Sequence, residues 1–340
     1  MTRDAHCPLC RSETDSLLRL RFNSKLNLPT EPEIRHCASD NFLFVSSGSQ
    51  HAYDEYYKSL VNDSYHAELS GGSLHSPISR LQQAKLVEAL DGFFVQNRKV
   101  LDFGCGEASL LIELAGEFPS SFFVGFDPGP AARIGSNKAS LLGLSNLTIA
   151  NQEETTKHGP YDLVILSQVA EHLLDFKLLK KLDSLLTADG LLYIEVPNSL
   201  LYEKHNRQEF LYYFDRLHVN HFTPQSLARL AESFNFFSVA HFEYTFPYRD
   251  GGEYPALGML FSKSRHCDAI SSPRILDTAN RYIFQEKQRA RAVAAQFDKG
   301  EGTLVWGAGD NFFRSVENGG PLSDLTNMVV LDRKRPDLPS

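Results

Sequence analysis

The sequence has no long run of basic residues. Its net charge is −8, and residues 333–335 form its only basic cluster. Nucleic acids attract proteins through clustered Lys and Arg, so we expect no nucleic-acid partner. Long apolar runs are missing as well, since none approaches the about 20 residues of a membrane span. Residues 1–6 lead into no apolar core, so we expect no signal peptide, no membrane partner and a cytoplasmic location.

Solenoid repeats and low-complexity tracts are also absent. Hydrophobic residues make up 42% of the chain and charged residues 22%, which is ordinary for a globular protein. A chain of 340 residues is long enough for two or three domains, each with its own core. The sequence therefore predicts a multidomain globular protein.

The most informative stretch is the apolar run 99–103, which passes through Gly104, Cys105 and Gly106 into the apolar-periodic segment 107–114. This order predicts a buried strand, a tight turn and a helix, the first unit of a doubly wound α/β sheet. Glycine is needed where the turn bends sharply and a ligand approaches bare backbone. We interpret the Cys105 side chain as a small buried apolar group.

A second apolar run, 122–126, ends in Asp127. A carboxylate at the tip of the second strand can accept both hydroxyls of a ribose. The third glycine of a dinucleotide fingerprint is missing, because Ser109 stands there. Asp102, just before the turn, would repel a phosphate but can bind an ammonium group. These features favour a nucleoside with a zwitterionic tail over NAD.

This arrangement resembles motif I of the class I S-adenosylmethionine (SAM)-dependent methyltransferases, with Gly104 and Gly106 as its glycines and Asp127 as its ribose acid. The resemblance implies a Rossmann-like domain that binds SAM near Asp102, Cys105 and Pro128. It also implies that the tip of the third strand (147–150) meets the adenine, through Gln152 or Glu153. The alternative is a solvated polar loop at that tip.

A fourth strand is predicted at 161–166, followed by Ser167 and Gln168 at its carboxyl end. Ligands bind at this edge of a doubly wound sheet. We expect the helix from Val169 to continue to about Leu185, and a fifth strand at 191–198. The segment 167–172 resembles the signature after the fourth strand of the same methyltransferases. Glu171 and His172 line the cofactor pocket or, alternatively, pack the start of the helix.

Cysteines gather near the start of the chain, as Cys7, Cys10 and Cys37. In a reducing compartment, Cys-x-x-Cys followed by a further cysteine predicts a metal site more often than a disulfide. Two thiolates on one knuckle reach a single tetrahedral Zn²⁺. Asp40 stands where a fourth cysteine would be expected, and His36 and His6 are the other candidate ligands. A degenerate knuckle without zinc is the alternative.

The segment 214–223 contains His218 and His221, one turn apart if this piece is helical. Histidine is available as a general base at neutral pH. Thr223 before Pro224 predicts the start of a helix. Packing roles for the histidines are the alternative.

Together these segments resemble the zinc-containing sugar C-methyltransferases, over nearly the whole chain. The resemblance implies catalytic Tyr, Glu and His in this segment. In this sequence the Tyr, Glu and His positions are occupied by His218, Asn220 and His221, so only the last position, His221, keeps the residue type of the family. It also implies a small polar acceptor, such as a nucleotide-linked sugar, methylated at carbon or oxygen.

The end of the chain repeats the opening pattern. Residues 303–309 predict a strand ending in Gly-Ala-Gly, and 329–332 a strand ending in Asp332. Phe312 stands at the third glycine position, and one and a half units cannot bury both faces of a parallel sheet. The resemblance implies that this Rossmann-like segment helps to form the substrate cleft. An NAD-dependent oxidoreductase is the alternative function, and a non-catalytic SAM-fold or zinc-binding module is a third.

The predicted organisation has five parts. They are a zinc-binding domain (1–50), a Tyr-rich connection or lid (51–80), the SAM-binding domain (81–200), a substrate cap that completes the sheet (201–270), and a linker helix with a partial Rossmann-like unit (271–340).

Overall fold

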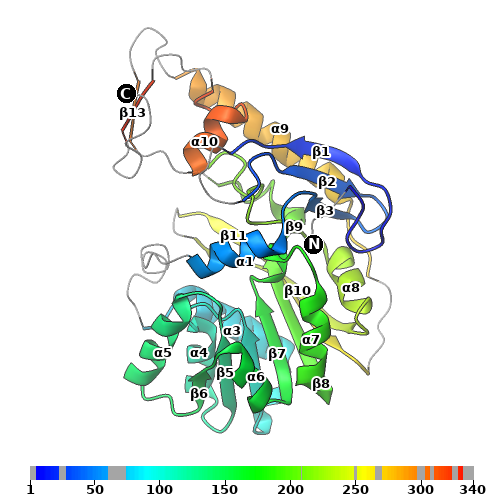
Figure 1. Ribbon diagram of the computed structural model, residues 1–340, viewed down its shortest axis with the longest axis vertical. Helices are drawn as coiled ribbons and strands as arrows, with labels where there is room; N and C mark the ends of the chain where they lie inside the picture. The colour runs from blue at the N-terminus through cyan, green and yellow to red at the C-terminus, as the bar shows by residue number, and fades with distance from the viewer. Residues whose placement is uncertain are drawn as a thin grey trace.

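A computed structural model describes residues 5–22, 28–59, 74–207, 209–248, 251–264, 270–296, 303–306, 310–323 and 328–331. Its largest element is a seven-stranded sheet with the order β10-β11-β8-β7-β4-β5-β6 (Figure 1). The strands are β4 (Lys99–Phe103), β5 (Phe122–Phe126), β6 (Leu147–Ile149), β7 (Tyr161–Ser167), β8 (Leu186–Pro197), β10 (Phe237–Pro247) and β11 (Glu253–Ser262). Strands β4 to β8 are parallel, and the β10–β11 hairpin adds antiparallel to β8. The predicted doubly wound α/β sheet is confirmed.

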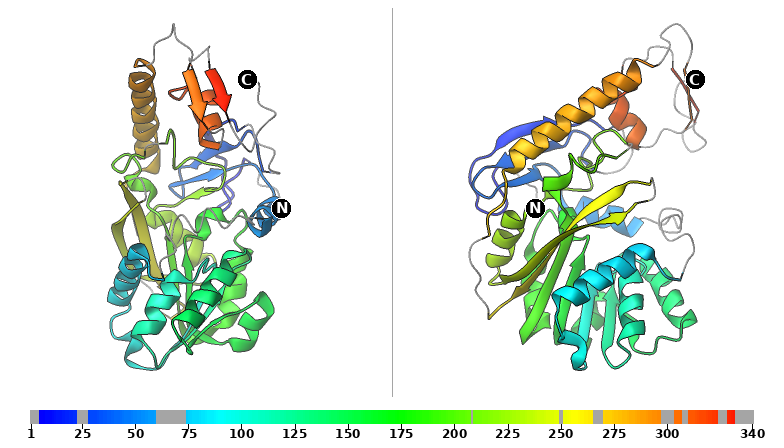
Figure 2. Two further views of the ribbon diagram at one scale, coloured as in Figure 1. Left: turned by 90° about the vertical axis from the view of Figure 1, so that its left-hand side faces the viewer. Right: turned by 180° about the vertical axis from the view of Figure 1, so that it is seen from behind.

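The apolar runs become central strands because both faces of the sheet are covered. Successive residues point to opposite faces, so Val100 and Leu101 enter two different cores. The core around Val100 includes α3 (Pro77–Ala89), α4 (Ser109–Glu117) and α5 (Ala131–Leu141). The core around Leu101 includes α7 (Lys177–Leu185) and α8 (Pro224–Glu232). Figure 2 shows the α3–α4 layer against the sheet.

The strand order reverses at β4, which has β5 on one side and β7 on the other. The connections after β4 and β7 therefore lead away from each other and leave room between them at the carboxyl ends of the strands. The predicted SAM residues lie at or just after the carboxyl ends of β4, β5, β6 and β7, which places them at this edge. It is therefore the place to look for a ligand site.

The helix expected from Val169 to Leu185 is interrupted, so that prediction was wrong in its extent. A short 3-10 helix, η2 (Ala170–His172), ends before α7 begins. The Gln50 side-chain oxygen accepts the backbone N–H groups of Leu174 and Asp175 at 3.0 and 3.3 Å. The Asp175 carboxylate then accepts the N–H of Lys177 at 2.8 Å. These bonds satisfy the backbone at the break, a role that apolar spacing alone cannot reveal.

The N-terminal residues form a separate antiparallel sheet with the order β1-β2-β3-β9. Its strands are β1 (Asp15–Arg19), β2 (Glu33–Cys37), β3 (Phe42–Val45) and β9 (Asn220–His221). Strand β9 comes from the segment considered as a helix, and it is extended because His221 pairs with Leu43. Helix α8 then begins as predicted, with Thr223 as its N-cap. The long-range strand pair thus ties the N-terminal sheet to the chain that follows β8.

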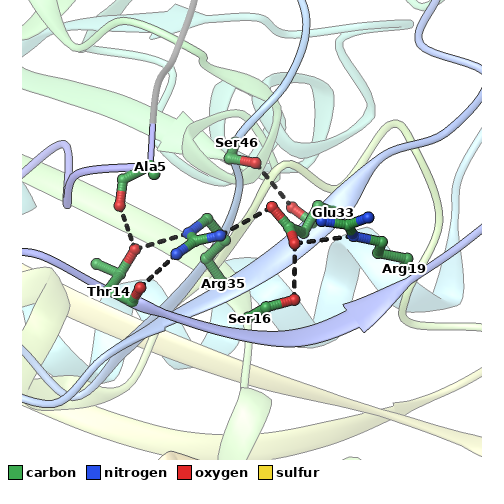
Figure 3. Close-up of polar contacts among 7 residues, drawn as sticks. All are labelled: Ala5, Thr14, Ser16, Arg19, Glu33, Arg35 and Ser46. Carbon is green, nitrogen blue, oxygen red and sulfur yellow. Dashed lines mark hydrogen bonds and ion pairs between the residues drawn. The ribbon is translucent and has the colours of Figure 1, made fainter.

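A charged clamp joins β1 to β2 (Figure 3). The Glu33 carboxylate accepts hydrogen bonds from Ser16, Arg19 and Arg35 at 2.7, 3.0 and 2.8 Å. Burial by itself raises the pKa of Glu33, but these donors outweigh it and lower that pKa to about 2. The clamp therefore stays ionised over the physiological range.

Helix α1 (Gln50–Ser59) lies across the carboxyl edge of the central sheet, below the N-terminal sheet (Figure 1). The backbone oxygen of Tyr57 would lie 3.3 Å from a Cβ at Gly129, so α1 closely approaches the loop after β5. Tyr53 is fully buried and donates to the Arg216 carbonyl at 2.6 Å. Of the predicted lid, residues 60–73 lie outside the described residues.

The remaining elements include the 3-10 helix η1 (Phe93–Val95), which packs on the central sheet before β4, and a C-terminal part that lies away from that sheet (Figure 2). The others are the 3-10 helix η3 (Ser199–Leu201), the long helix α9 (Ile275–Ala294), and β12 (Thr303–Trp306), α10 (Asp310–Glu317) and β13 (Met328–Leu331). Strands β12 and β13 pair in parallel as a two-stranded sheet. Residues 307–309 and Asp332 lie outside the described residues. Among the helices that are described, none has the length and apolarity to span a membrane.

Candidate functional site

The turn after β4 depends on glycine for two reasons. Gly104 and Gly106 have φ angles of +92° and +53°, in the left-handed region that side chains disfavour. A Cβ at Gly104 would also lie 2.5 Å from a methyl carbon of Val169. Cys105, between them, is half-buried with its Sγ turned against Gly125, and burial raises the pKa of its thiol. The turn therefore presents backbone rather than side chains.

Asp127 bridges the ends of β4 and β5. One carboxylate oxygen accepts the N–H of Gly106 at 3.0 Å, and the other accepts the N–H of Gly129 at 2.7 Å. A carboxylate has about four acceptor sites, so two remain for a ligand. Pro128, next in the chain, is exposed and fixes the backbone there.

Asp102 lies beneath this turn and is only 2% exposed. Its Oδ1 is buried without a hydrogen-bond partner among the described residues. Burial raises the pKa of Asp102 from 3.8 to about 8, and the charges of Asp127 and Glu195 add to the effect. A cation near this carboxylate would reverse the shift.

Glu195 is the residue of this site that sequence reasoning missed. It lies in β8, is fully buried, and accepts bonds from a set of polar side chains. These are Gln82 (2.6 Å), Ser167 (3.1 Å), Gln168 (3.2 Å), Tyr193 (2.8 Å) and Tyr244 (2.5 Å). Five donors satisfy a buried carboxylate that would otherwise be costly. A glutamate inside the apolar run 191–197 was the signal that could have found it.

The segment after β7 turns back across the edge. Gln168 has a φ of +56°, and its N–H donates to the Glu195 carbonyl at 2.8 Å. Glu171, in η2, is 1% exposed, and neither carboxylate oxygen has a partner among the described residues. Burial raises the pKa of Glu171 to about 8, with the charge of Glu195 contributing. Both alternatives for this residue, packing the turn and lining a pocket, fit its position.

His172 packs beside Tyr57 of α1 and His218, with ring centroids 5.6 and 5.1 Å away. Its Nδ1 lies 3.0 Å from the Leu217 carbonyl. Burial, together with the nearby His218, lowers the pKa of His172 to about 4. The ring is therefore neutral at pH 7, so Nδ1 carries the hydrogen donated to the carbonyl and Nε2 keeps a lone pair.

The two histidines proposed as bases occupy different places. His218 is half-buried beside His172, and the Asp215 carboxylate accepts its backbone N–H at 2.9 Å. His221 is fully buried, with Nδ1 3.3 Å from the Tyr202 hydroxyl. Its Nε2 has no partner among the described residues. Burial lowers the pKa of His221 to about 3, so this ring is neutral at pH 7.

Asn220, which replaces the glutamate of the resembled family, has a clear structural task. Its side-chain amide donates to the carbonyls of Ala170 and Leu173, at 2.7 and 2.8 Å. It therefore holds η2 in position against β9. A group engaged in this way does not polarise a neighbouring base.

The predicted adenine contacts lie at the start of α6 (Gln152–His158). Asn151 caps this helix, accepting the N–H groups of Glu153 and Glu154 at 3.0 Å each. The side chains of Gln152 and Glu153 are exposed, and Glu153 pairs with Lys157 at 2.8 Å. An adenine contact here would use the backbone or Gln152 more readily than the paired carboxylate.

Cys7, Cys10, Cys37 and Asp40 come together at one corner of the N-terminal sheet. Their ligand atoms all lie within 4.8 Å of one another. The Cys10 and Cys37 sulfurs are 3.6 Å apart, and an Asp40 oxygen lies 3.1 Å from the Cys7 sulfur. Sulfurs on one tetrahedral Zn²⁺ are about 3.7 Å apart. The four residues therefore fit a zinc ion, and neither His6 nor His36 belongs to the group.

Residues 78–241 match the family model of a methyltransferase domain. This part of the chain, just under half of its length, is similar to that family and contains the Rossmann-like α/β sheet. No curated protein matches the chain.

Solved structures with a similar fold include several methyltransferases. A magnesium protoporphyrin IX methyltransferase from Synechocystis PCC 6803 with bound SAH shows 18% identity over 64% of this chain and 100% of its own, with a TM-score of 0.47. A 1,6-didemethyltoxoflavin N1-methyltransferase from Burkholderia thailandensis shows 16% identity over 72% and 100%, with a TM-score of 0.46. A SAM-dependent methyltransferase from Methanosarcina mazei shows 17% identity over 51% and 96%, with a TM-score of 0.41. Likeness at this level does not identify a substrate.

Proposed function

We propose that this protein is a SAM-dependent methyltransferase that acts on a small polar acceptor. The observation that carries the proposal is a set of carboxyl groups without basic partners among the described residues. Four carboxylates lie at or near the carboxyl edge of the sheet, and no ion pair joins any of them to Lys or Arg among the described residues. They are Asp102, Asp127, Glu171 and Glu195. A cation bound there favours the ionised form of Asp102 and Glu171, so the site suits a ligand with a net positive charge better than a pyrophosphate.

SAM fits this site because its sulfonium and ammonium groups outweigh its single carboxylate, and it supplies the methyl group. In our proposal the free acceptor sites of Asp127 hold the ribose hydroxyls, and Asp102 holds the ammonium group.

The backbone of Gly104–Gly106 supports the tail, while Pro128, Gln152 or Glu153 border the adenine. Ser167, Gln168 and His172 close the other side. The residues thus orient the donor and exclude water from it.

The acceptor must lose a proton when its oxygen or carbon is methylated. We propose His221 for this step, because its buried Nε2 carries a lone pair that no described group occupies. Its low pKa makes it a weak base, so an acidified acceptor suits it best. A nucleotide-linked sugar stays a prediction, since Asn220 does not supply the polarising carboxylate of the resembled family.

Calorimetry with SAM tests the donor site. Parent protein should bind SAM with a stoichiometry near one, and Asp127→Ala should bind at least about tenfold more weakly because a charged hydrogen bond is lost. Asp54→Ala on the exposed side of α1 is the matched control and should bind like the parent. Equal affinity of the parent and Asp127→Ala would contradict the proposal. No SAM heat together with clear binding of NAD would favour the oxidoreductase instead.

We also propose a structural zinc ion at Cys7, Cys10, Cys37 and Asp40. Three of the ligands are buried, and thiolates that share a metal are stabilised in the charged form. Metal analysis of purified protein should find one zinc per chain, and Cys37→Ser should lose it. Zinc-free parent protein that unfolds at the same temperature as the zinc-loaded sample would refute a structural role.

A further inference from the structure

Glu171, His172 and His218 form a second cluster of metal-binding side chains, apart from the cysteines. Their ligand atoms all lie within 4.8 Å of one another. The His172 Nε2 is 3.8 Å from a Glu171 oxygen, and the ring centroids of His172 and His218 are 5.1 Å apart. Ligand atoms on one ion lie about 3.0–3.5 Å apart, so adjustments of about 1 Å would bring all three to a common centre.

Several polar atoms of this cluster are buried without a hydrogen-bond partner among the described residues, which is unusual for buried groups. Glu171 is 1% exposed, and both of its oxygens lack partners among the described residues. A buried carboxylate without donors costs several kcal/mol unless a cation compensates it. The buried Nδ1 of His218 also has no partner there. Three lone-pair-bearing groups therefore face one small space.

The surroundings of His172 prepare it as a ligand. Its Nδ1 donates to the Leu217 carbonyl, which leaves Nε2 unprotonated toward the cluster. Metal-binding histidines are oriented in this way by a carbonyl or carboxylate on the other ring nitrogen. The cluster itself is assembled from distant segments, because the amide of Asn220 holds η2 against β9.

We propose that Glu171, His172 and His218 bind a divalent transition-metal ion, such as Mn²⁺, Fe²⁺ or Zn²⁺. Two imidazoles and one carboxylate are a ligand set typical of these metals, and they leave further coordination positions open. Ca²⁺, in contrast, is a hard ion that is bound by oxygen ligands alone, so this ligand set does not suit it. The ion also supplies the positive charge that the orphaned Glu171 carboxylate lacks.

This ion would define the class of acceptor, a step that rests on the proposed methyl transfer. A hydroxyl oxygen on an open position becomes more acidic, so a base as weak as His221 can take its proton. The oxygen lone pair then forms the bond to the methyl carbon, and the electrons of the broken carbon–sulfur bond stay on sulfur. The acceptor is thus an alcohol or phenol whose oxygen can bind a metal.

Titration of the full-length protein with Mn²⁺, followed by the EPR signal of the free ion, tests the site directly. We expect the parent to bind one Mn²⁺ per chain, because thiolates are poor ligands for this hard ion. Glu171→Gln and His218→Ala should each raise the Kd at least about tenfold. His75→Ala is the matched control, since His75 also faces a glutamate, Glu113, at 3.0 Å, and it should bind like the parent.

A parallel titration with Zn²⁺ uses Cys37→Ser as the background, so that the cysteine cluster does not compete. Failure of both ions to bind, or equal affinities in the parent and both variants, overturns the proposal. If Glu171→Gln does not fold, the site is tested by His218→Ala alone, since His218 is only half-buried. SAM calorimetry in the presence of a chelator is read separately. If the parent binds SAM but no metal ion, only this inference is refuted. If it binds the metal ion but no SAM, only the proposed methyltransferase function is refuted.

Discussion

Replacing Asp102 by asparagine is expected to make the ligand-free protein more stable while it weakens SAM binding. The buried carboxyl group has its pKa raised from 3.8 to about 8. In the unfolded chain the group ionises near pH 3.8, whereas the folded protein keeps the proton until about pH 8. The folded state therefore loses stability relative to the unfolded state as the pH rises from about 4 to 8.

The size of the effect follows from the shift. At pH 7 the unfolded state gains about 4 kcal/mol from ionising a group that the fold keeps protonated. Asparagine does not ionise in either state, so Asp102→Asn avoids this loss. The amide N–H group of the asparagine needs a hydrogen-bond partner, and its burial without one reduces the gain in stability by about 1–2 kcal/mol. We expect a net gain of about 2 kcal/mol at pH 7 and no gain at pH 4.

Urea unfolding at several pH values between 4 and 8 measures the prediction, with Asp162→Asn as the control. Asp162 lies in β7 and accepts the N–H of Lys99 at 2.9 Å, so its variant should be less stable by about 1 kcal/mol. If the parent and Asp102→Asn show the same slope of stability against pH, Asp102 is not a strongly desolvated carboxyl group.

The same variant tests the role of Asp102 toward SAM. An ammonium group beside Asp102 favours the ionised carboxylate, so SAM binding to the parent at pH 7 should release close to one proton. Calorimetry in buffers with different ionisation enthalpies counts that proton. Asp102→Asn should release none and bind SAM more weakly. Unchanged affinity and unchanged proton release would refute the ammonium contact.

Three further changes probe the architecture of the site. Gly104→Ala places a Cβ 2.5 Å from Val169 at a φ of +92°, so urea unfolding should show a loss of about 2–3 kcal/mol. Glu195→Gln replaces the charged acceptor of five hydrogen bonds and should cost about 3 kcal/mol by the same measurement. Cys37→Ser should lower the midpoint of thermal unfolding of zinc-loaded protein by several degrees and remove its sensitivity to chelators.

The first two of these changes have a control in the chain. Gly143→Ala also has a positive φ, of +67°, but meets nothing within 4 Å. It therefore isolates the backbone strain, and equal losses at both glycines would rule out the contact with Val169. Glu88→Gln, at an exposed position of α3, should leave stability unchanged. A Glu195→Gln protein as stable as the parent would show that its buried charge is not needed.

Much of the fold could be predicted from the chain because the determining signals are local. The apolar runs 99–103 and 161–166 are buried on both faces, and period and length alone indicate such strands. The glycines at 104 and 106 indicate the turn, since φ angles of +92° and +53° are readily available only to glycine. The Cys7-x-x-Cys10 spacing is a local signal too, whereas Cys37, 27 residues after Cys10, joins the cluster only through the fold.

Other features depend on contacts between distant segments, which a linear pattern does not contain. His218 and His221 looked equivalent, but pairing of β9 with β3 makes the segment extended, so His218 lies beside His172 and His221 lies in the core. The break before α7 depends on Gln50, more than 120 residues away.

The charge of the site also depends on contacts between distant segments. The sequence alone determined that acidic residues lie at the ends of the strands. It could not show that, among the described residues, no donor reaches the buried Asp102 Oδ1 or either Glu171 oxygen, whereas five donors reach Glu195. Desolvation and hydrogen bonding set the protonation of a carboxyl group, and both arise only when remote side chains surround it. The sequence therefore determined which strand, turn and ligand types were available, and the tertiary structure decided which of them meet.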